Sequence, residues 1–255
     1  MYLNLNSNLA NSYSSSSQKI RVLTESWVKE NIYCPSCGNY IDEYENNRPV
    51  ADFYCKKCKE DFELKSKNGN IGKKIVDGAY STMIERLNSS QNPNFFFLTY
   101  DKKSLDVFNF LVIPKHFFTP DIIEKRKPLS STAKRAGWVG CNILLNTIPN
   151  NGKLFYIKNR DIQPKNKLLE QWHKFHFLQK FSNIQVKGWL LDIIKCIEAL
   201  NKDTFTLKEL YTFEEYLRIK HPKNNNIKAK IRQQLQILRD MNYLKFISRG
   251  KYKLN

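Results

Sequence analysis

Residues 48–67 read RPVADFYCKKCKEDFELKSK, and this stretch decides the fold of the first half of the chain. Its second part, Phe62–Glu63–Leu64–Lys65, alternates apolar and charged side chains. Because successive side chains of a strand point to opposite faces, Glu63 and Lys65 would share one face while Phe62 and Leu64 face a core. The stretch therefore predicts a strand with one charged face, directly after a turn that holds two cysteines.

Four cysteines around this strand have the spacing of metal ligands. Two residues separate the members of each pair, and seventeen separate the pairs: Cys34, Cys37, Cys55 and Cys58. Thiolates at this spacing can close a tetrahedral zinc site, and residues 1–17 carry no secretory signal that would favour disulfides. Four thiolates leave no open position for water, so we expect a structural Zn²⁺. Free or redox-active thiols are the alternative.

The carboxylates beside the cysteines suggest a second, catalytic metal. If zinc holds the neighbouring strands together, Asp52 lies opposite Glu63 and Lys65. Two carboxylates with backbone or phosphate oxygens suit Mg²⁺, and a lysine beside that cation can orient or help deprotonate an attacking water. The pattern predicts metal-assisted phosphodiester hydrolysis. Asp61 shares the face of Glu63 and competes with Asp52 as the second carboxylate, and a solvated charged strand is the alternative to any site.

The charge of the chain points to a polyanionic partner. The formal net charge is +18, and residues 184–255 contribute +8 of it, from 15 Lys and Arg against 7 Asp and Glu. Each phosphate that a basic side chain neutralises releases counterions, so two basic halves favour two nucleic-acid surfaces. A generally basic proteome is the alternative. No run of apolar residues is long enough for a membrane span, and no glycine-rich phosphate-binding motif indicates a nucleotide cofactor.

Mixed helices and strands are predicted for the first domain. Apolar residues at helical spacing predict helices over residues 17–30 and 72–87. Short apolar runs predict strands over 94–100, 107–114 and 152–158. The pattern loosens over 159–188, where we expect a linker. The first domain is therefore expected to be an α/β or α+β domain over residues 1–183.

The remaining residues, 184–255, are predicted to form a winged helix-turn-helix. Helical patterns cover residues 188–200, 205–219 and 224–242. Thr206 is a plausible N-cap, and Glu209 three residues on completes a capping box. Two short strands around a turn at Arg249-Gly250 would form the wing.

The third of these helices is the expected recognition helix. Lys228, Arg232 and Gln236 lie on the face opposite its apolar residues, where they would meet bases in the major groove. Asn225 stands near the helix start, and Arg249 and Lys251 on the wing are expected to contact phosphates. A helix face that is only solvated is the alternative.

The order of acidic and basic residues resembles the PD-(D/E)xK nuclease motif, with its proline displaced to Pro49. More specifically, the runs ENNRPVADFYCKKCKEDFELKSKNGN (45–70), DGAY (77–80), NPNFFFLTY (92–100), AGWVGCN (136–142) and IRQQLQILRD (231–240) resemble the DpnI-like restriction endonucleases. The resemblance extends from LTESWV at 23–28 to SRGKYK at 248–253. It implies a PD-(D/E)xK catalytic domain with an embedded zinc site and a C-terminal winged helix.

The resemblance also implies a function and roles for single residues. DpnI-like enzymes are methyl-dependent type II restriction endonucleases that cleave GATC when its adenine is N6-methylated. Asp52 and Glu63 would hold Mg²⁺, Lys65 would be the catalytic lysine, and Trp138 would belong to a methyladenine pocket. Lys134 and Arg135 beside this indole would hold phosphates. We expect a monomer that acts on double-stranded DNA in the bacterial cytoplasm, by direct attack of water without a covalent intermediate.

Two rival functions remain open at this point. Burying one methyl-sized group contributes about 0.8 kcal/mol, which discriminates only several-fold, so two methyl groups read in two domains are expected to act together. A non-enzymatic, zinc-containing winged-helix regulator would share the cysteines and the basic charge. A structure-selective nuclease would cut without regard to methylation. The Asp52, Glu63 and Lys65 triad separates an enzyme from the regulator.

Overall fold

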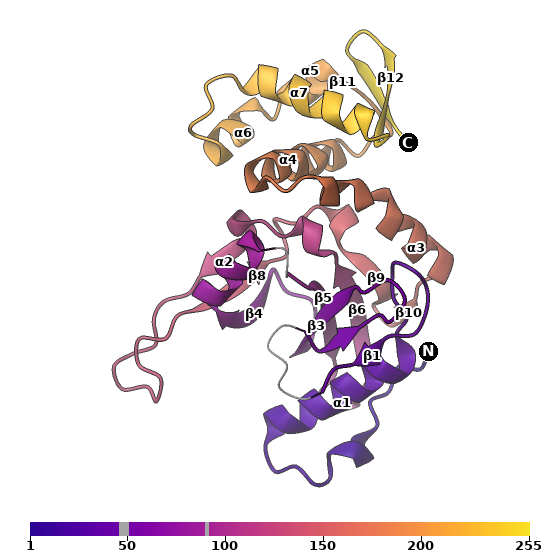
Figure 1. The fold of residues 1–255 in the computed structure, drawn as a ribbon, viewed down its shortest axis with the longest axis vertical. Helices are drawn as coiled ribbons and strands as arrows, with labels where there is room; N and C mark the ends of the chain where they lie inside the picture. Colours follow the sequence, from indigo (N-terminus) through magenta and orange to yellow (C-terminus); the bar gives the residue numbers. More distant parts are fainter. Residues whose placement is uncertain (46–50, 90–91) are drawn as a thin grey trace. The chain divides into compact units, whose positions relative to one another are not determined.

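The computed structural model describes residues 1–45, 51–89 and 92–255 (Figure 1). The chain divides into two compact units: the first comprises residues 1–147 and 151–175, and the second comprises 148–150 and 176–255. Each unit buries its own apolar side chains. Pro49, the displaced proline of the expected motif, lies outside the described residues. Within the described parts of the chain, no helix combines the length and the apolar character that crossing a membrane requires.

The first unit is a mixed α/β structure with two sheets. The larger sheet contains, in spatial order, β1 (Asp42–Glu43), β2 (Phe53–Tyr54), β3 (Asp61–Asn68), β5 (Asn94–Tyr100), β6 (Val107–Ile113), β9 (Leu154–Lys158) and β10 (Asp161–Ile162). The smaller sheet contains β4 (Lys74–Ala79), β8 (Gly140–Leu144) and β7 (Ile123–Lys125). The helices are α1 (Ser16–Asn31), α2 (Tyr80–Asn88) and α3 (Lys165–Lys174), with short 3-10 helices η1 (Ser7–Ala10), η2 (Lys115–Phe117), η3 (Pro120–Ile122) and η4 (Asn150–Gly152).

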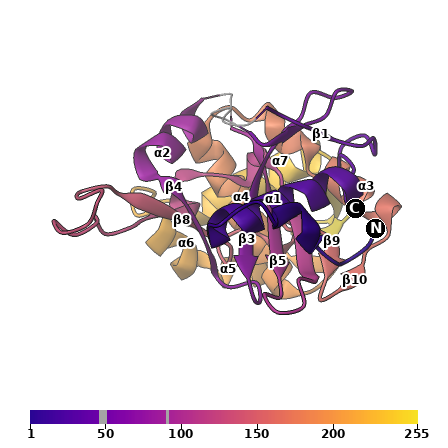
Figure 2. The same ribbon diagram turned by 90° about the horizontal axis from the view of Figure 1, so that it is seen from below.

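Strand β3 confirms the alternation expected for residues 62–65, because Phe62 and Leu64 face the core. Phe62 is fully buried and stacks on Phe96 of β5, with ring centroids 4.5 Å apart. Trp27 of α1 belongs to the same core, so α1 covers this face of the sheet, and Figure 2 shows α1 in front of β3 and β5. Strands β3 and β5 are parallel, whereas the other neighbours in the sheet are antiparallel. The charged side chains of β3 therefore point away from α1.

Two predictions for the first unit are wrong. The expected helix over 72–87 begins as strand β4, and only its second half is helix α2. In β4 the buried Ile75 and Asp77 alternate with the exposed Val76, a period of two that the helical pattern concealed. The expected linker over 159–188 contains helix α3, because its Trp172 is fully buried in the core. The helix over 17–30 and the three predicted strands are confirmed within one to two residues at either end.

The second unit contains a helix-turn-helix with a β-hairpin after it. Its elements are η5 (His176–Lys180), α4 (Ile184–Leu200), β11 (Thr204–Thr206), α5 (Leu207–Tyr211), α6 (Glu214–Lys220), α7 (Ile227–Asp240), β12 (Leu244–Ser248) and β13 (Lys251–Leu254). The capping box is confirmed: Glu209 N donates to Thr206 Oγ1 at 3.2 Å, and Thr206 N donates to Glu209 Oε2 at 2.7 Å. The expected helix over 205–219 is broken into α5 and α6. Gly250 turns the hairpin with a φ of +71°, where a glycine avoids a steric cost.

Candidate active site and metal centre

The four predicted zinc ligands converge in the first unit. All four Sγ atoms of Cys34, Cys37, Cys55 and Cys58 lie within 4.8 Å of one another. The two cysteine turns have the same backbone geometry. Cys34 N donates to Asn39 O at 2.7 Å, and Cys55 N donates to Glu60 O at 2.9 Å. In each turn, the residue four positions after the first cysteine has a positive φ, 73° at Gly38 and 61° at Lys59.

The cluster fits a tetrahedral metal ion with sulfur ligands. A Zn–S distance of about 2.3 Å places tetrahedral thiolates about 3.8 Å apart. Two of the Sγ–Sγ distances are 3.4 Å, between Cys34 and Cys58 and between Cys37 and Cys55. Burial raises the pKa of Cys34 and of Cys58. Burial acts in the same direction on Cys37, but hydrogen bonds from Asn39 prevail and lower its pKa to about 7. The four-cysteine cluster can therefore bind a zinc ion once its thiols are deprotonated.

The charged face of β3 carries a compact ion-pair cluster. Lys65 Nζ lies 2.6 Å from Glu63 Oε1 and 2.5 Å from Asp77 Oδ1. Arg86 Nη1 lies 3.0 Å from Glu63 Oε2. Asp77 comes from β4 and Arg86 from α2, so three elements meet at this strand. We call Glu63, Lys65, Asp77 and Arg86 the β3 cluster.

The β3 cluster is strongly coupled by its charges. Burial raises the pKa of the Glu63 carboxyl; the charge of Lys65 opposes this rise, and the charge of Asp77 adds to it. Burial works to lower the pKa of Lys65, but the negative charges of Glu63 and Asp77 outweigh it and the net shift is upward. Lys65 is therefore a cation at neutral pH. Two carboxylates balance two cations here, so the cluster is formally neutral.

Asp52 directly precedes β2, on the side of β3 opposite β5, and is not part of the β3 cluster. Its backbone N donates to Phe62 O at 2.9 Å, and its Oδ2 accepts from Leu64 N at 2.6 Å. The N–H and C=O of one residue point to the same side of a strand, so the Leu64 carbonyl also faces Asp52. Asp61, the competing carboxylate, accepts from the Tyr44 hydroxyl at 2.7 Å. Sequence analysis did not predict Asp77 and Arg86 as site residues. The signal that could have found Asp77 is its place two residues after Ile75, on the same face of a strand with a period of two.

Trp138 lies at the base of a long connection between β7 and β8, which Figure 1 shows reaching away from both sheets. Arg126 N donates to Gly140 O at 2.9 Å, so the two ends of this connection are paired. The Arg135 guanidinium lies 4.4 Å from the centre of the Trp138 indole. A Cβ at Gly140 would lie only 2.8 Å from the indole, so glycine permits this close approach. Lys134 and Arg135 are exposed.

In the second unit, the predicted DNA-contacting residues are exposed: Asn225, Lys228, Arg232, Gln236, Arg249 and Lys251. Two of them also make contacts within the unit. Arg232 Nη1 donates to the Tyr211 hydroxyl at 2.8 Å, and Lys228 Nζ lies 3.4 Å from Glu214 Oε2. These contacts orient both side chains from α7 toward α5 and α6.

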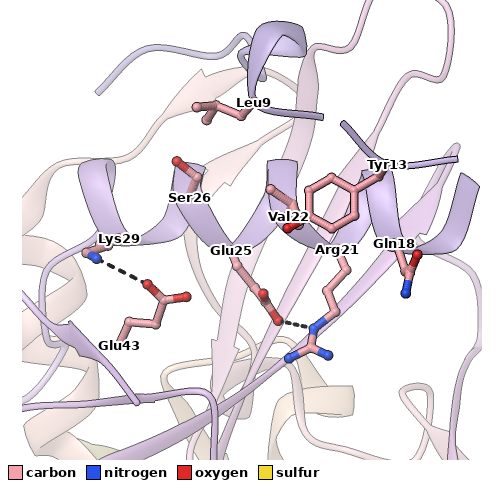
Figure 3. A pocket seen from close by; sticks show the side chains of 9 residues that line it. All are labelled: Leu9, Tyr13, Gln18, Arg21, Val22, Glu25, Ser26, Lys29 and Glu43. Atoms are coloured by element: carbon pink, nitrogen blue, oxygen red, sulfur yellow. Dashed lines mark hydrogen bonds and ion pairs between the residues drawn. The ribbon is translucent and has the colours of Figure 1, made fainter. Parts of the chain in front are cut away.

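A separate pocket of about 530 Å³ lies along α1 (Figure 3). Its lining contains two ion pairs, Arg21 with Glu25 at 2.7 Å and Lys29 with Glu43 at 3.2 Å. Each positive charge is balanced within the pocket, so it offers no excess charge to an ion. The full lining is Leu9, Tyr13, Gln18, Arg21, Val22, Glu25, Ser26, Lys29 and Glu43, which includes none of the predicted site residues.

Two family models match the chain. The model described as "DpnI: Dam-replacing family" matches residues 1–181. The model described as "DpnI_C: Dam-replacing HTH domain" matches residues 185–254.

Proposed function

Because the chain belongs to the DpnI, or Dam-replacing, family of restriction endonucleases, we propose that it cleaves double-stranded DNA at GATC sites whose adenine is N6-methylated. The observation that carries the chemistry is the charged face of β3, with the Glu63–Lys65 ion pair at 2.6 Å and Asp52 bonded to the same strand at Leu64. The family match to a helix-turn-helix over residues 185–254 supports DNA as the partner.

The chemical type of the oxygen donors at β3 suits a magnesium ion. The carboxylates of Asp52 and Glu63 and the carbonyl of Leu64 are hard ligands of the kind that Mg²⁺ takes in small numbers, with water in its other positions. A magnesium ion held there would stabilise negative charge on the scissile phosphate and lower the pKa of a bound water. Glu63 would hold the ion only where Lys65 or Arg86 moves off it, since each of these cations now contacts one of its oxygens.

Lys65 acts on the reacting atoms as a fixed cation. Its ammonium group can donate hydrogen bonds to the attacking water and to a phosphate oxygen, which aligns the two. The water oxygen forms a bond to phosphorus while the P–O bond to one sugar oxygen breaks. The products are a phosphate monoester and a hydroxyl, with no covalent enzyme intermediate.

The remaining parts of the proposal concern architecture. The first domain, residues 1–183, adopts a PD-(D/E)xK nuclease fold, and Zn²⁺ binds at Cys34, Cys37, Cys55 and Cys58. The mixed parallel and antiparallel sheet around β3 and the convergence of the four thiols support these two points. Residues 184–255 form a winged-helix domain. The enzyme acts as a monomer in the bacterial cytoplasm and needs no nucleotide cofactor.

Methyl recognition uses one element from each unit. In the first unit, the Trp138 indole contacts the methyl group while Lys134 and Arg135 hold phosphates; the cation over the indole and the exposed basic side chains support this. In the second unit, the exposed row of α7 reads bases, with Asn225 at its start and Arg249 and Lys251 of the wing on phosphates. Burying one methyl group contributes only about 0.8 kcal/mol. Two methyl contacts together would therefore give a larger preference for methylated over unmethylated DNA than one contact can.

A cleavage assay on one plasmid from two hosts tests the proposed function. We expect the purified protein with Mg²⁺ to cut plasmid from an adenine-methylating host into discrete fragments ending at GATC, and to leave plasmid from a non-methylating host intact. Equal cutting of both plasmids would retain the nuclease and discard methyl recognition. Binding without cutting, by zinc-loaded protein, would favour the non-enzymatic regulator.

Substituting a single glutamine of α7 tests base reading by the winged helix. We expect Gln236→Ala to weaken binding to a methylated GATC duplex by about tenfold or more, because a good base contact contributes roughly 1–3 kcal/mol. Fluorescence anisotropy with Ca²⁺ in place of Mg²⁺ measures this affinity without cleavage.

Gln185→Ala is the matched control, because Gln185 is exposed in the same unit but lies on α4, outside the predicted contact row of α7. Its affinity should stay within about twofold of the unmodified protein. An equal loss from both substitutions would contradict base reading by Gln236.

A further inference from the structure

We propose that Asp77 is a positioning residue for cleavage: it holds the Lys65 side chain in its reactive place. This inference rests on the proposed function, because the position of Lys65 matters only in a nuclease. The central observation is the 2.5 Å contact between Lys65 Nζ and Asp77 Oδ1. This contact joins β3 of the larger sheet to β4 of the smaller sheet, across twelve residues of sequence.

Asp77 is aimed at Lys65 by the shape of β4. Its side chain is 4% exposed, against 24% for Lys65, so the carboxylate lies behind the ammonium group as seen from solvent. Asp77 pairs in register with the fully buried Cys141 of β8, and the register shifts between Asp77 and Ala79. A bulge of this kind turns the strand and redirects a side chain, often beside an active site.

Stability is a weak reason for a carboxylate at this position. Desolvating two charges costs free energy that their attraction only partly returns, and apolar residues of similar size often serve a core equally well. Ile75, on the same face of β4, is such a residue. The carboxylate of Asp77 is therefore better explained by what it does to Lys65.

The role follows from the two partners that Lys65 has. Glu63 is the other partner, at 2.6 Å, and the proposed function requires Glu63 to turn its oxygens to a cation. Lys65 then depends on Asp77 to restrict a flexible stem of four carbons. Displacing a reacting group by about 1 Å can cost on the order of a hundredfold in rate, so the second anchor matters for cleavage.

Lysine acylation tests the anchor without DNA or metal. We expect Asp77→Asn to raise the rate at which an amine-reactive acetylating reagent modifies Lys65 by at least about threefold, measured by peptide mass spectrometry. Lys67, two residues along the same strand and exposed, is the internal reference and should react at an unchanged rate. An unchanged Lys65 rate would overturn the inference.

Cleavage kinetics test the consequence. In single turnover at saturating Mg²⁺, we expect Asp77→Asn to cut methylated plasmid at least about tenfold more slowly, with duplex affinity in Ca²⁺ within twofold and an unchanged Mg²⁺ midpoint. Asp77→Glu keeps the negative charge but places it one methylene further out. Its cleavage rate should lie between the rates of the unmodified protein and of Asp77→Asn. Asp77→Glu also replaces Asp77→Asn as the test variant if Asp77→Asn does not fold. A loss that high Mg²⁺ restores would make Asp77 a metal ligand instead and overturn the inference.

The control breaks another ion pair of the same small sheet. Glu124→Gln removes the partner of Lys74, at 2.6 Å, and should cut at the rate of the unmodified protein. The unmodified protein also separates the two proposals. If it does not cut methylated plasmid, the proposed function fails; if it cuts and Asp77→Asn cuts equally well, only the positioning role fails.

Discussion

Lys65→Ala is expected to lower the rate of DNA cleavage by about a hundred- to a thousandfold, the loss that removing one preorganised hydrogen-bond donor from the transition state causes. The substitution removes the ammonium group that lies between Glu63 and Asp77. Binding to a methylated duplex in Ca²⁺ should stay within about threefold, because one of many cations is lost. Single-turnover cleavage of methylated plasmid measures the rate, and anisotropy measures the affinity.

The same substitution has a predictable effect on stability. It leaves the buried Asp77 carboxylate without its cation, which raises the free energy of the folded state. The assays should therefore be run well below the melting temperature of the variant, which circular dichroism measures. Lys67→Ala is the matched control: it removes an exposed lysine from the same strand and should leave cleavage unchanged. Full cleavage activity of a folded Lys65→Ala variant would contradict the proposed catalytic role of Lys65.

Removing the zinc ion that we propose for the four cysteines is expected to unfold the first unit. Structural zinc in small metal-binding domains contributes about 10–16 kcal/mol of apparent binding free energy at pH 7, which equals or exceeds the net stability of an ordinary domain. Cys34 and Cys55 are fully buried, and Cys55 lies three residues after Asp52, so the second cysteine turn also holds the segment that carries Asp52. Cys55→Ser should lose the bound zinc, the first-unit melting transition and cleavage together.

The measurements are zinc content by mass spectrometry and the thermal transition followed by circular dichroism. We expect one zinc per chain in the unmodified protein. Acidification should release it, because the bound thiolates must take up protons, and the pKa of Cys34 and of Cys58 is already raised by burial. Cys196→Ser, at a buried thiol outside the cluster, should keep its zinc. A zinc-free protein that is folded and active would contradict the structural role.

The spacing of residues that are close in the sequence was sufficient to predict part of this structure. The C-x2-C pairs predicted a convergence of four thiols that the structure has, because two thiols at that spacing fit one turn around one ion. The alternation around Glu63 and Lys65 predicted the charged face of β3. Thr206 and Glu209 predicted a capping box because their contacts span three residues. In each case the deciding interactions lie within a few residues of sequence.

Sequence periodicity did not predict the secondary structure where tertiary packing decides between helix, strand and linker. Residues 72–87 satisfy a helical period, yet the pairing of β4 with β8 made the first half a strand. The pattern loosens over residues 159–188, which predicts a linker, yet helix α3 forms at Lys165–Lys174 because Trp172 is fully buried in the core. Burial against distant elements overrides local propensity when the apolar surface it removes from water is large.

By itself, the sequence determined the four cysteines that converge, the charged face of β3 and the helix-turn-helix, since each depends on the chemistry of near neighbours. Only the tertiary structure decided which side chains surround Lys65. It placed Asp77 rather than Asp52 on the ammonium group and brought Arg86 to Glu63. The physical reason is that these contacts join separate elements, and their meeting depends on how the two sheets and α2 pack over the whole unit.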